Sequence, residues 1–174
     1  MSEETRYIRR GDRYYAATQA LVTTTVGLAT TYTGLGVSNP ITSSVNLVLG
    51  ICSLMQSVIQ AVQPEAYAIA VGYNSATNVT HTTPVTPRNS MVGSARTPIA
   101  LADVAATLPT APFYHTFVHN TGAATVNGTG AVIDLNGTIV LRPGAYALWV
   151  TPAQASVAGL WFSFTWEEKP AVGN

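Results

Sequence analysis

A chain of 174 residues is long enough for one domain that is held by its own apolar core. Charged residues make up only 9% of the chain, whereas about 25% is usual for a soluble domain, and the formal net charge is zero. This composition excludes a broadly basic nucleic-acid-binding domain. It favours a protein that packs against other subunits, because a surface with few charges is cheap to desolvate. The alternative is a β domain whose surface is rich in Thr for its strand propensity.

Three sequence features bear on the compartment and on the membrane. The single cysteine, Cys52, excludes an internal disulfide, so the apolar core must hold the fold. The most apolar stretch, residues 45–63, is interrupted by polar side chains and is too short for a transmembrane helix. The leading segment contains acidic residues and lacks a convincing cleavage pattern. We therefore expect no membrane partner and no export through the general secretory route.

The first segment of the chain concentrates charge and tyrosine. Arginine and tyrosine are frequent anchors of protein interfaces. We interpret residues 1–15 as an extended arm that binds a partner, followed by a β-sandwich domain at 16–170 and a short tail at 171–174. The alternative for the arm is a frayed, solvated terminus. The candidate contact residues of the arm are Arg6, Tyr7, Arg9, Arg10, Arg13, Tyr14 and Tyr15.

The next part of the chain is typical of strands separated by turns. Residues 18–34 are rich in β-branched side chains, which disfavour a helix. Residues 45–54 follow a turn signal at 38–40 and are predicted to form a buried strand, with a short helical turn as the alternative for residues 53–62. Residues 66–73 alternate large and small side chains, as a strand with two different faces does.

Residues 74–110 are predicted to form a long loop, because four prolines stand there among many Thr, Ser and Asn residues. The local composition allows one helical turn within residues 99–108. Surface loops of this kind commonly make contacts with partners.

The last third of the chain has the clearest pattern. We predict a strand at 112–120, turns at 127–130 and 135–137, two strands within 138–150 joined at Pro143-Gly144, and a closing strand at 158–168. The alternation of the closing strand places one set of side chains inward and the other outward. The inward set is Leu160, Phe162, Phe164 and Trp166, and the outward set is Trp161, Ser163, Thr165 and Glu167.

About eight short strands with turn signals at this spacing predict an all-β fold with little helix, a jelly-roll or Greek-key β-sandwich. Residues typical of catalysis are scarce. His115 and His119 lie about 13 Å apart if they share one strand, which is too far for a common metal ion. We place them on one strand face beside Phe113 and Phe117, near a subunit contact or a symmetry axis.

No nucleophile motif stands in the sequence, and Cys52 lies in an apolar run that suggests core filling. Acidic residues are too few in the body of the chain for a paired-carboxylate mechanism. We therefore predict that the protein is not an enzyme and that it takes no cofactor, no metal ion and no small-molecule substrate.

Four segments together resemble small structural proteins of tailed bacteriophages. They are residues 39–50 (NPITSSVNLVLG), 72–95 (GYNSATNVTHTTPVTPRNSMVGSA), 108–122 (LPTAPFYHTFVHNTG) and 133–168 (IDLNGTIVLRPGAYALWVTPAQASVAGLWFSFTWEE). The chain resembles capsid decoration, or cement, proteins in particular. The resemblance implies a jelly-roll or Greek-key sandwich, often a homotrimer, that is made in the host cytoplasm and sits on the capsid surface of the virion. Such proteins bind over joints between major capsid proteins, and here the arginines of the arm would pair with acidic capsid surface.

Two alternative functions stay open at this stage. A receptor- or glycan-binding module of a head or tail fibre would stack sugars on Trp149, Trp161 and Tyr73, and a fibrous shaft would normally precede it. A small jelly-roll coat protein is the other alternative, and the number of copies per particle distinguishes it from a decoration protein. A hydrolase would need an acid–base pair that the sequence does not reveal.

Overall fold

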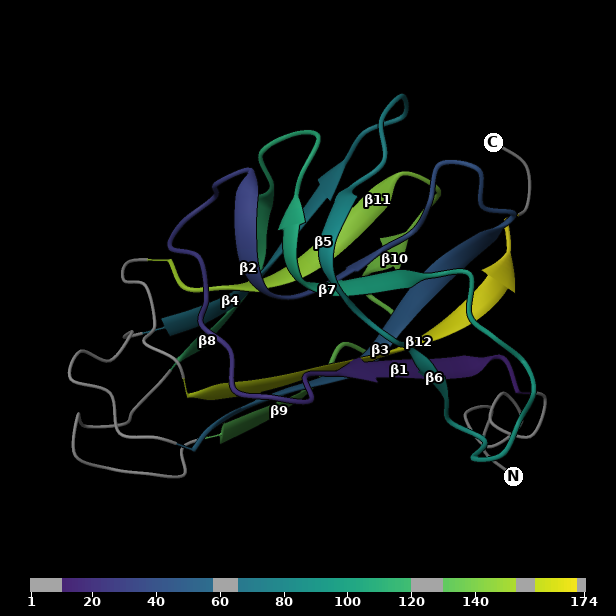
Figure 1. The fold of residues 1–174 in the computed structure, drawn as a ribbon, viewed down its shortest axis with the longest axis horizontal. Helices are drawn as coiled ribbons and strands as arrows, with labels where there is room; N and C mark the ends of the chain where they lie inside the picture. Colours follow the sequence, from purple (N-terminus) through teal and green to yellow (C-terminus); the bar gives the residue numbers. More distant parts are fainter. Residues whose placement is uncertain (1–10, 58–65, 120–129, 153–158, 172–174) are drawn as a thin grey trace.

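The computed structural model describes residues 11–57, 66–119, 130–152 and 159–171, and these residues form strands and no helix (Figure 1). None of them belongs to a helix that could cross a membrane. The strands are β1 (Arg13–Ala17), β2 (Thr31–Ser38), β3 (Val45–Gln56), β4 (Ala66–Tyr73), β5 (Thr80–Val85), β6 (Arg88–Asn89), β7 (Leu101–Thr107), β8 (Phe113–His119), β9 (Gly130–Asp134), β10 (Val140–Leu141), β11 (Ala145–Val150) and β12 (Leu160–Pro170).

The strands form two antiparallel sheets that pack against each other, so the prediction of an all-β sandwich is confirmed. Sheet I has the order β10-β3-β12-β1-β6, and β9 pairs with β3 on the same edge as β10. Sheet II has the order β5-β7-β2-β11-β4-β8. The chain passes repeatedly from one sheet to the other, so neighbours in sequence are mostly not neighbours in a sheet.

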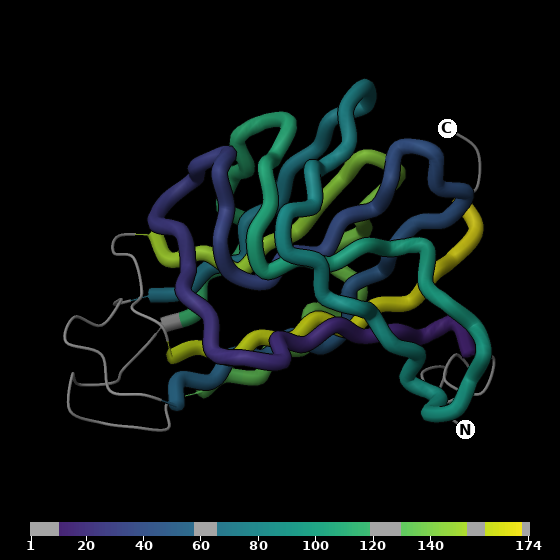
Figure 2. The backbone as a smooth tube through the Cα atoms, viewed as in Figure 1, coloured from purple at the N-terminus to yellow at the C-terminus, as the bar shows by residue number. Residues whose placement is uncertain are grey.

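Four of the strand pairs are nested in the sequence. The innermost pair is β4 with β8, followed outward by β3 with β9, β2 with β11 and β1 with β12. This is the pattern of one long antiparallel ribbon that has been rolled up into two sheets. The outermost pair, β1 and β12, therefore lies within sheet I, where Figure 2 shows the first and last coloured segments running side by side.

The core between the sheets is built on the predicted alternation of β12. Leu160, Phe162, Phe164 and Trp166 are at most 2% exposed, while the residues between them are half-buried on the opposite side of the strand. From sheet II, Trp149 stacks on Phe162 with the ring centroids 5.5 Å apart. The inward and outward sets of β12 are thus confirmed.

The central strands of sheet II, β11 and β4, are buried on both faces. Every residue of β11 is buried, and Tyr32, Tyr146 and Leu148 belong to a second apolar cluster on the face that points away from sheet I. The hydroxyl of Tyr32 donates to the backbone carbonyl of Trp149 (2.8 Å), and Leu28 packs against the cluster from a loop. Sheet I has no second apolar cluster on its outer side among the described residues. Its outer face is therefore the broad face of the sandwich that a partner protein can reach.

The region predicted to be loop-like, residues 74–110, is not one long loop but holds three strands, β5, β6 and β7. Pro84 is tolerated in β5 since this strand lies at the edge of sheet II, where a missing backbone N–H breaks no ladder. The helical turn allowed at 99–108 is also wrong. Those residues form β7 between β5 and β2, where pairing on both sides overrides the local helix propensity of alanine.

Two predicted turns are confirmed. Asn136 and Gly137 both have positive φ (45° and 72°), which suits the tight turn that follows β9. Gly144 has φ 89° and lies against the backbone of Asn74, so a side chain at this position would clash. The turn at Gly144 carries the chain from β10 of sheet I to β11 of sheet II. Ser53–Gln56 form the end of strand β3 and not the helical turn that was the alternative for residues 53–62. Residues 58–62 lie outside the described residues.

Candidate protein-interaction site

The structure divides the predicted arm into two parts. Arg6, Tyr7, Arg9 and Arg10 lie outside the described residues, whereas Arg13, Tyr14 and Tyr15 form β1 of sheet I. The sandwich therefore begins at Arg13 and not at residue 16. The physical reason is alternation, since β1 pairs with β12 and sends every second side chain into the core.

Each of the three β1 residues has a different environment. Tyr14 is 4% exposed and stacks on Trp166 with a centroid distance of 6.3 Å, so it belongs to the core. Arg13 is 8% exposed and Tyr15 is half-buried, and both point to the outer side of sheet I. Tyr14 is thus unsuitable as an anchor for a partner, and Tyr15 stays a candidate as part of a sheet face.

The end of the sandwich from which the N-terminal segment departs forms one candidate surface. We call it the docking end and define it as Gly11, Asp12 and loop 90–99. Asn89 donates through Nδ2 to the carbonyl of Gly11 (2.7 Å), and Arg96 forms an ion pair with Asp12. Loop 90–99 is fixed at its far end, because a carboxylate oxygen of Glu168 accepts bonds from two backbone N–H groups at 99–100.

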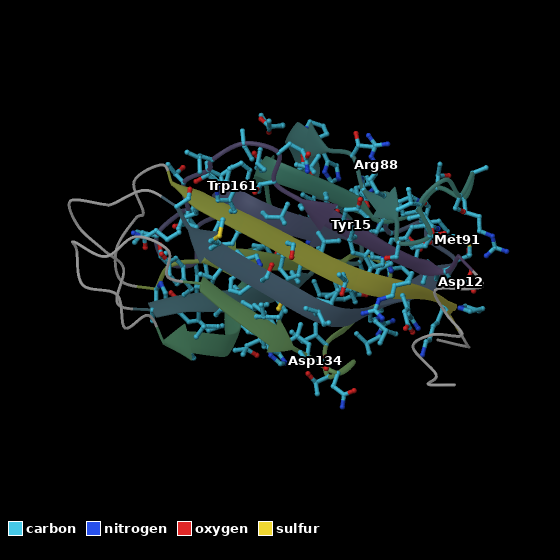
Figure 3. The ribbon with its side chains drawn as sticks, turned by 90° about the horizontal axis from the view of Figure 1, so that it is seen from below. Asp12, Tyr15, Arg88, Met91, Asp134 and Trp161 are labelled. Atoms are coloured by element: carbon cyan, nitrogen blue, oxygen red, sulfur yellow. The ribbon has the colours of Figure 1, made fainter. Side chains whose placement is uncertain are left out.

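Apolar side chains are exposed at the docking end. Val92 is 93% exposed and Met91 is 36% exposed, and Figure 3 shows Met91 beside Asp12 at one end of the molecule. Exposed apolar groups that are held in place next to charged ones are typical of sites that bind protein partners.

The outer side of sheet I forms the second candidate surface, which we call the open face. It consists of the outward side chains of β9, β3, β12, β1 and β6. Cross-strand pairing aligns one row across it, which runs in the order Asp134, Ile51, Thr165, Tyr15 and Arg88. Figure 3 shows this face with Asp134 and Arg88 at opposite margins and Tyr15 between them.

The hydroxyl groups at the centre of the open face bond within the protein. The Oγ atoms of Ser53 and Ser163 lie 2.6 Å apart. Thr165 Oγ1 accepts from the backbone N–H of Ile51 (2.8 Å) and donates to the carbonyl of the same residue (2.9 Å). Covering the centre of this face with another protein therefore leaves few polar groups without a partner.

A groove of about 360 Å³ lies at one end of the open face. Its floor includes Gly50, where a side chain is absent and the guanidinium of Arg13 comes close. Asp134, Glu167 and Lys169 also line it. Charges of both signs in one groove suit a polypeptide partner better than a simple anion or cation.

A buried His–Asp pair lies in sheet II. Nδ1 of His81 on β5 bonds Oδ2 of Asp103 on β7, and Asp103 is only 3% exposed. The other carboxylate oxygen, Oδ1, has no hydrogen-bond partner among the described residues. The sequence analysis missed this pair. One sequence feature could have indicated this pair: Asp103 is the single acidic residue of the apolar segment LADVAAT. A carboxylate in a buried strand needs a polar partner.

Cys52 lies in the core, as the sequence suggested, and its thiol is protected. Burial, together with the nearby charge of Asp134, raises the pKa of the Cys52 thiol to about 12. At pH 8 the thiolate is therefore a very small fraction, so iodoacetamide should leave the native protein unmodified and should react once denaturant is added. Mass spectrometry of the alkylated protein measures this, and rapid modification of the native protein would contradict the assignment.

The residues proposed for sugar stacking are not brought together as expected. Trp149 is fully buried, so its predicted exposure is wrong. Trp161 is half-buried and donates through Nε1 to Ser57 Oγ (2.9 Å), and Tyr73 lies under the guanidinium of Arg142, 5.3 Å from the ring centroid. Trp149 is buried because β11 is covered on both faces.

The predicted common face of β8 is also wrong. A register shift opposite Ile69 and Ala70 interrupts the alternation, so Phe113 pairs with Val71 and Phe117 pairs with Ala68. Val71 faces the core between the sheets and Ala68 faces the second cluster, which puts the two phenylalanines on opposite faces. In the described part of the chain, no three His, Cys, Asp or Glu side chains lie close enough to bind one metal ion.

The geometry thus defines a class of protein, an all-β sandwich with one open face, whose charges lie at its margins and at one end, and a docking end with exposed apolar side chains. No family model, no curated protein and no solved structure matches the chain.

Proposed function

We propose that the protein is a capsid decoration, or cement, protein of a tailed bacteriophage, which binds over joints between major capsid proteins and stabilises the head. The observation that carries this proposal is the docking end, where the exposed apolar tip of loop 90–99 stands beside the exit of the basic N-terminal segment. An apolar contact with adjacent arginines suits a protein surface that carries acidic groups.

The strand order supports the same class. The nested pairs give β1-β12-β3-β9 in one sheet and β2-β11-β4-β8 in the other, which is the order of an eight-stranded jelly roll. Jelly rolls recur in the shells of viruses. In this interpretation β5, β6 and β7 are an insertion between β4 and β8 that widens both sheets and supplies loop 90–99.

The energetics of a cement protein fit a body with few charges. Such a protein gains affinity from many weak contacts that the symmetry of the capsid repeats, and it needs no single strong site. A homotrimer, as the resemblance implies, would engage several capsid subunits at once. The partners in this proposal are the major capsid protein and further copies of the chain.

Removal of residues 2–10 should abolish capsid binding and leave the sandwich folded. The deletion ends before Gly11 because Asn89 bonds its carbonyl and β1 begins shortly after it. Circular dichroism checks the fold, and co-sedimentation with expanded heads measures occupancy. A second variant that replaces Arg6, Arg9 and Arg10 with alanine tests whether charge alone is required.

Binding of the truncated protein at full occupancy would show that the basic segment is not the capsid-binding element. The number of copies per purified virion separates the remaining roles, since decoration, coat and fibre proteins differ widely in stoichiometry. A copy number equal to that of the major shell subunit would favour a coat protein instead.

A further inference from the structure

We propose that a second copy of this chain docks on the open face, so that two sheets I pack face to face around a two-fold axis parallel to β12. This inference goes beyond the proposed function, because it concerns self-association in the absence of a capsid, and it predicts a two-fold dimer in place of the homotrimer that the resemblance implies. It rests on the order of charges across the open face.

The central row of the open face is self-complementary in charge, and the two charged side chains further along β12, Glu167 and Lys169, pair with each other (3.4 Å). Its central row begins with Asp134 on β9 at one margin and ends with Arg88 on β6 at the other. The strand between them in the middle of the row is β12, which contributes Thr165. Rotation by 180° about an axis along β12 exchanges the two margins. Arg88 of each copy then lies opposite Asp134 of the other, and both contacts form at once.

The two marginal charges are free to make these contacts. Neither Arg88 nor Asp134 takes part in an ion pair among the described residues, and both are exposed. Asp134 Oδ1 accepts from the backbone N–H of Asn136 (2.8 Å), which fixes the carboxylate at the margin.

The centre of the row suits packing against its own copy. Ile51, Thr165 and Tyr15 are half-buried and carry no charge, and the hydroxyl of Thr165 is already bonded to Ile51. Uncharged groups at the centre of the row with charges at its ends are the usual arrangement of a protein interface.

The size of the face predicts a weak dimer. Five strands at a spacing of about 4.8 Å, over a strand length of roughly 20 Å, give a projected area on the order of 400 Å². This is about half of the 800 Å² that a stable interface buries on each partner, so only a weak and transient dimer is expected. The charges at the margins therefore decide whether the dimer forms, and dissociation in the micromolar range is expected.

A charge-reversal experiment on the full chain tests the contact. Arg88→Asp places two acids opposite each other at both margins, and Asp134→Arg places two bases there. Each variant alone should raise the dissociation constant of the dimer by about tenfold or more. An equimolar mixture of the two variants should restore association, because each margin then pairs one acid with one base. Sedimentation velocity between about 1 μM and 1 mM measures this.

A second disrupting variant, a neutral control variant and a check of folding complete the experiment. Ser163→Lys puts a charge on the two-fold axis opposite its own copy and should also abolish the dimer. Arg142→Glu removes an exposed base that lies over Tyr73, away from the row, and should leave the dissociation constant unchanged. Circular dichroism of every variant verifies folding.

A protein that stays monomeric up to the highest concentration, or a trimer that is insensitive to the reversals, would overturn the inference. So would a mixture of the two charge variants that associates no better than either alone. These outcomes leave the capsid proposal untouched, since co-sedimentation of the residue 2–10 deletion tests that proposal separately.

Discussion

Replacement of Phe164 with alanine should lower the free energy of unfolding by about 3–5 kcal/mol, the range for a large aromatic residue removed from a packed core. Phe164 is fully buried in the middle of sheet I, opposite Cys52 on β3 and Ala16 on β1. Its ring also contacts Trp149 of sheet II, with a centroid distance of 5.9 Å. The cavity is therefore bounded by β strands on several sides, which limits its collapse.

Urea denaturation followed by tryptophan fluorescence measures the loss, and the midpoint should fall while the slope stays constant. Phe117→Ala is a matched control, because the same side chain is 61% exposed on the edge strand β8. We expect this control to cost less than about 1 kcal/mol. Equal effects of the two substitutions would contradict the assignment of Phe164 to the core.

Replacement of His81 with alanine should cost about 3–5 kcal/mol, because it removes the only described side-chain partner of a buried carboxylate. Asp103 is 3% exposed, and its Oδ1 already lacks a hydrogen-bond partner among the described residues. The histidine side chain is itself 22% exposed, so water can replace part of the lost interaction and the lower half of the range is expected.

A double-mutant cycle tests the origin of the His81 effect. The variant that combines His81→Ala with Asp103→Ala should be more stable than His81→Ala alone, since no charge is then left buried. His115→Ala on the exposed side of β8 is the control and should be nearly neutral. Additive single effects would mean that the pair does not couple.

The strands with regular alternation were predictable from the sequence. Large and small side chains alternate in residues 66–73, which indicates a strand with two different faces. Aromatic and polar side chains alternate in 158–168, which indicates one face in the core and one outside it. The all-β sandwich follows from several such segments. The turns at 135–137 and at Pro143-Gly144 were predictable because their residues suit positive φ or a fixed φ.

Other elements depended on pairing that the sequence does not display. β5 contains Pro84 and β7 is rich in alanine, and both became strands because neighbouring strands supply their hydrogen bonds. The register shift in β8 puts Phe113 and Phe117 on opposite faces of the sheet, and no local sequence pattern predicts such a shift. Tyr14 was assigned to the arm because it stands among charges, yet its pairing with Trp166 draws it into the core.

The candidate surfaces were predictable only in part. A low proportion of charge indicated a surface suited to protein contacts, but composition cannot say which face carries it. The row from Asp134 to Arg88 joins residues from distant parts of the chain, so only the sheet order brings them into one line. Four of the seven predicted arm residues lie outside the described residues, and their role stays a prediction.

The position of β12 has a consequence for how the protein is made. β12 is the last described strand in the sequence, yet it lies between β3 and β1 and carries Phe164 and Trp166. During translation, sheet I lacks its middle strand until residue 170 has left the ribosome. Pairing between the first and last strands is slow, because it closes a long loop. Sheet I is therefore completed only after residue 170 has emerged, and shorter nascent chains present no finished open face on which to assemble prematurely.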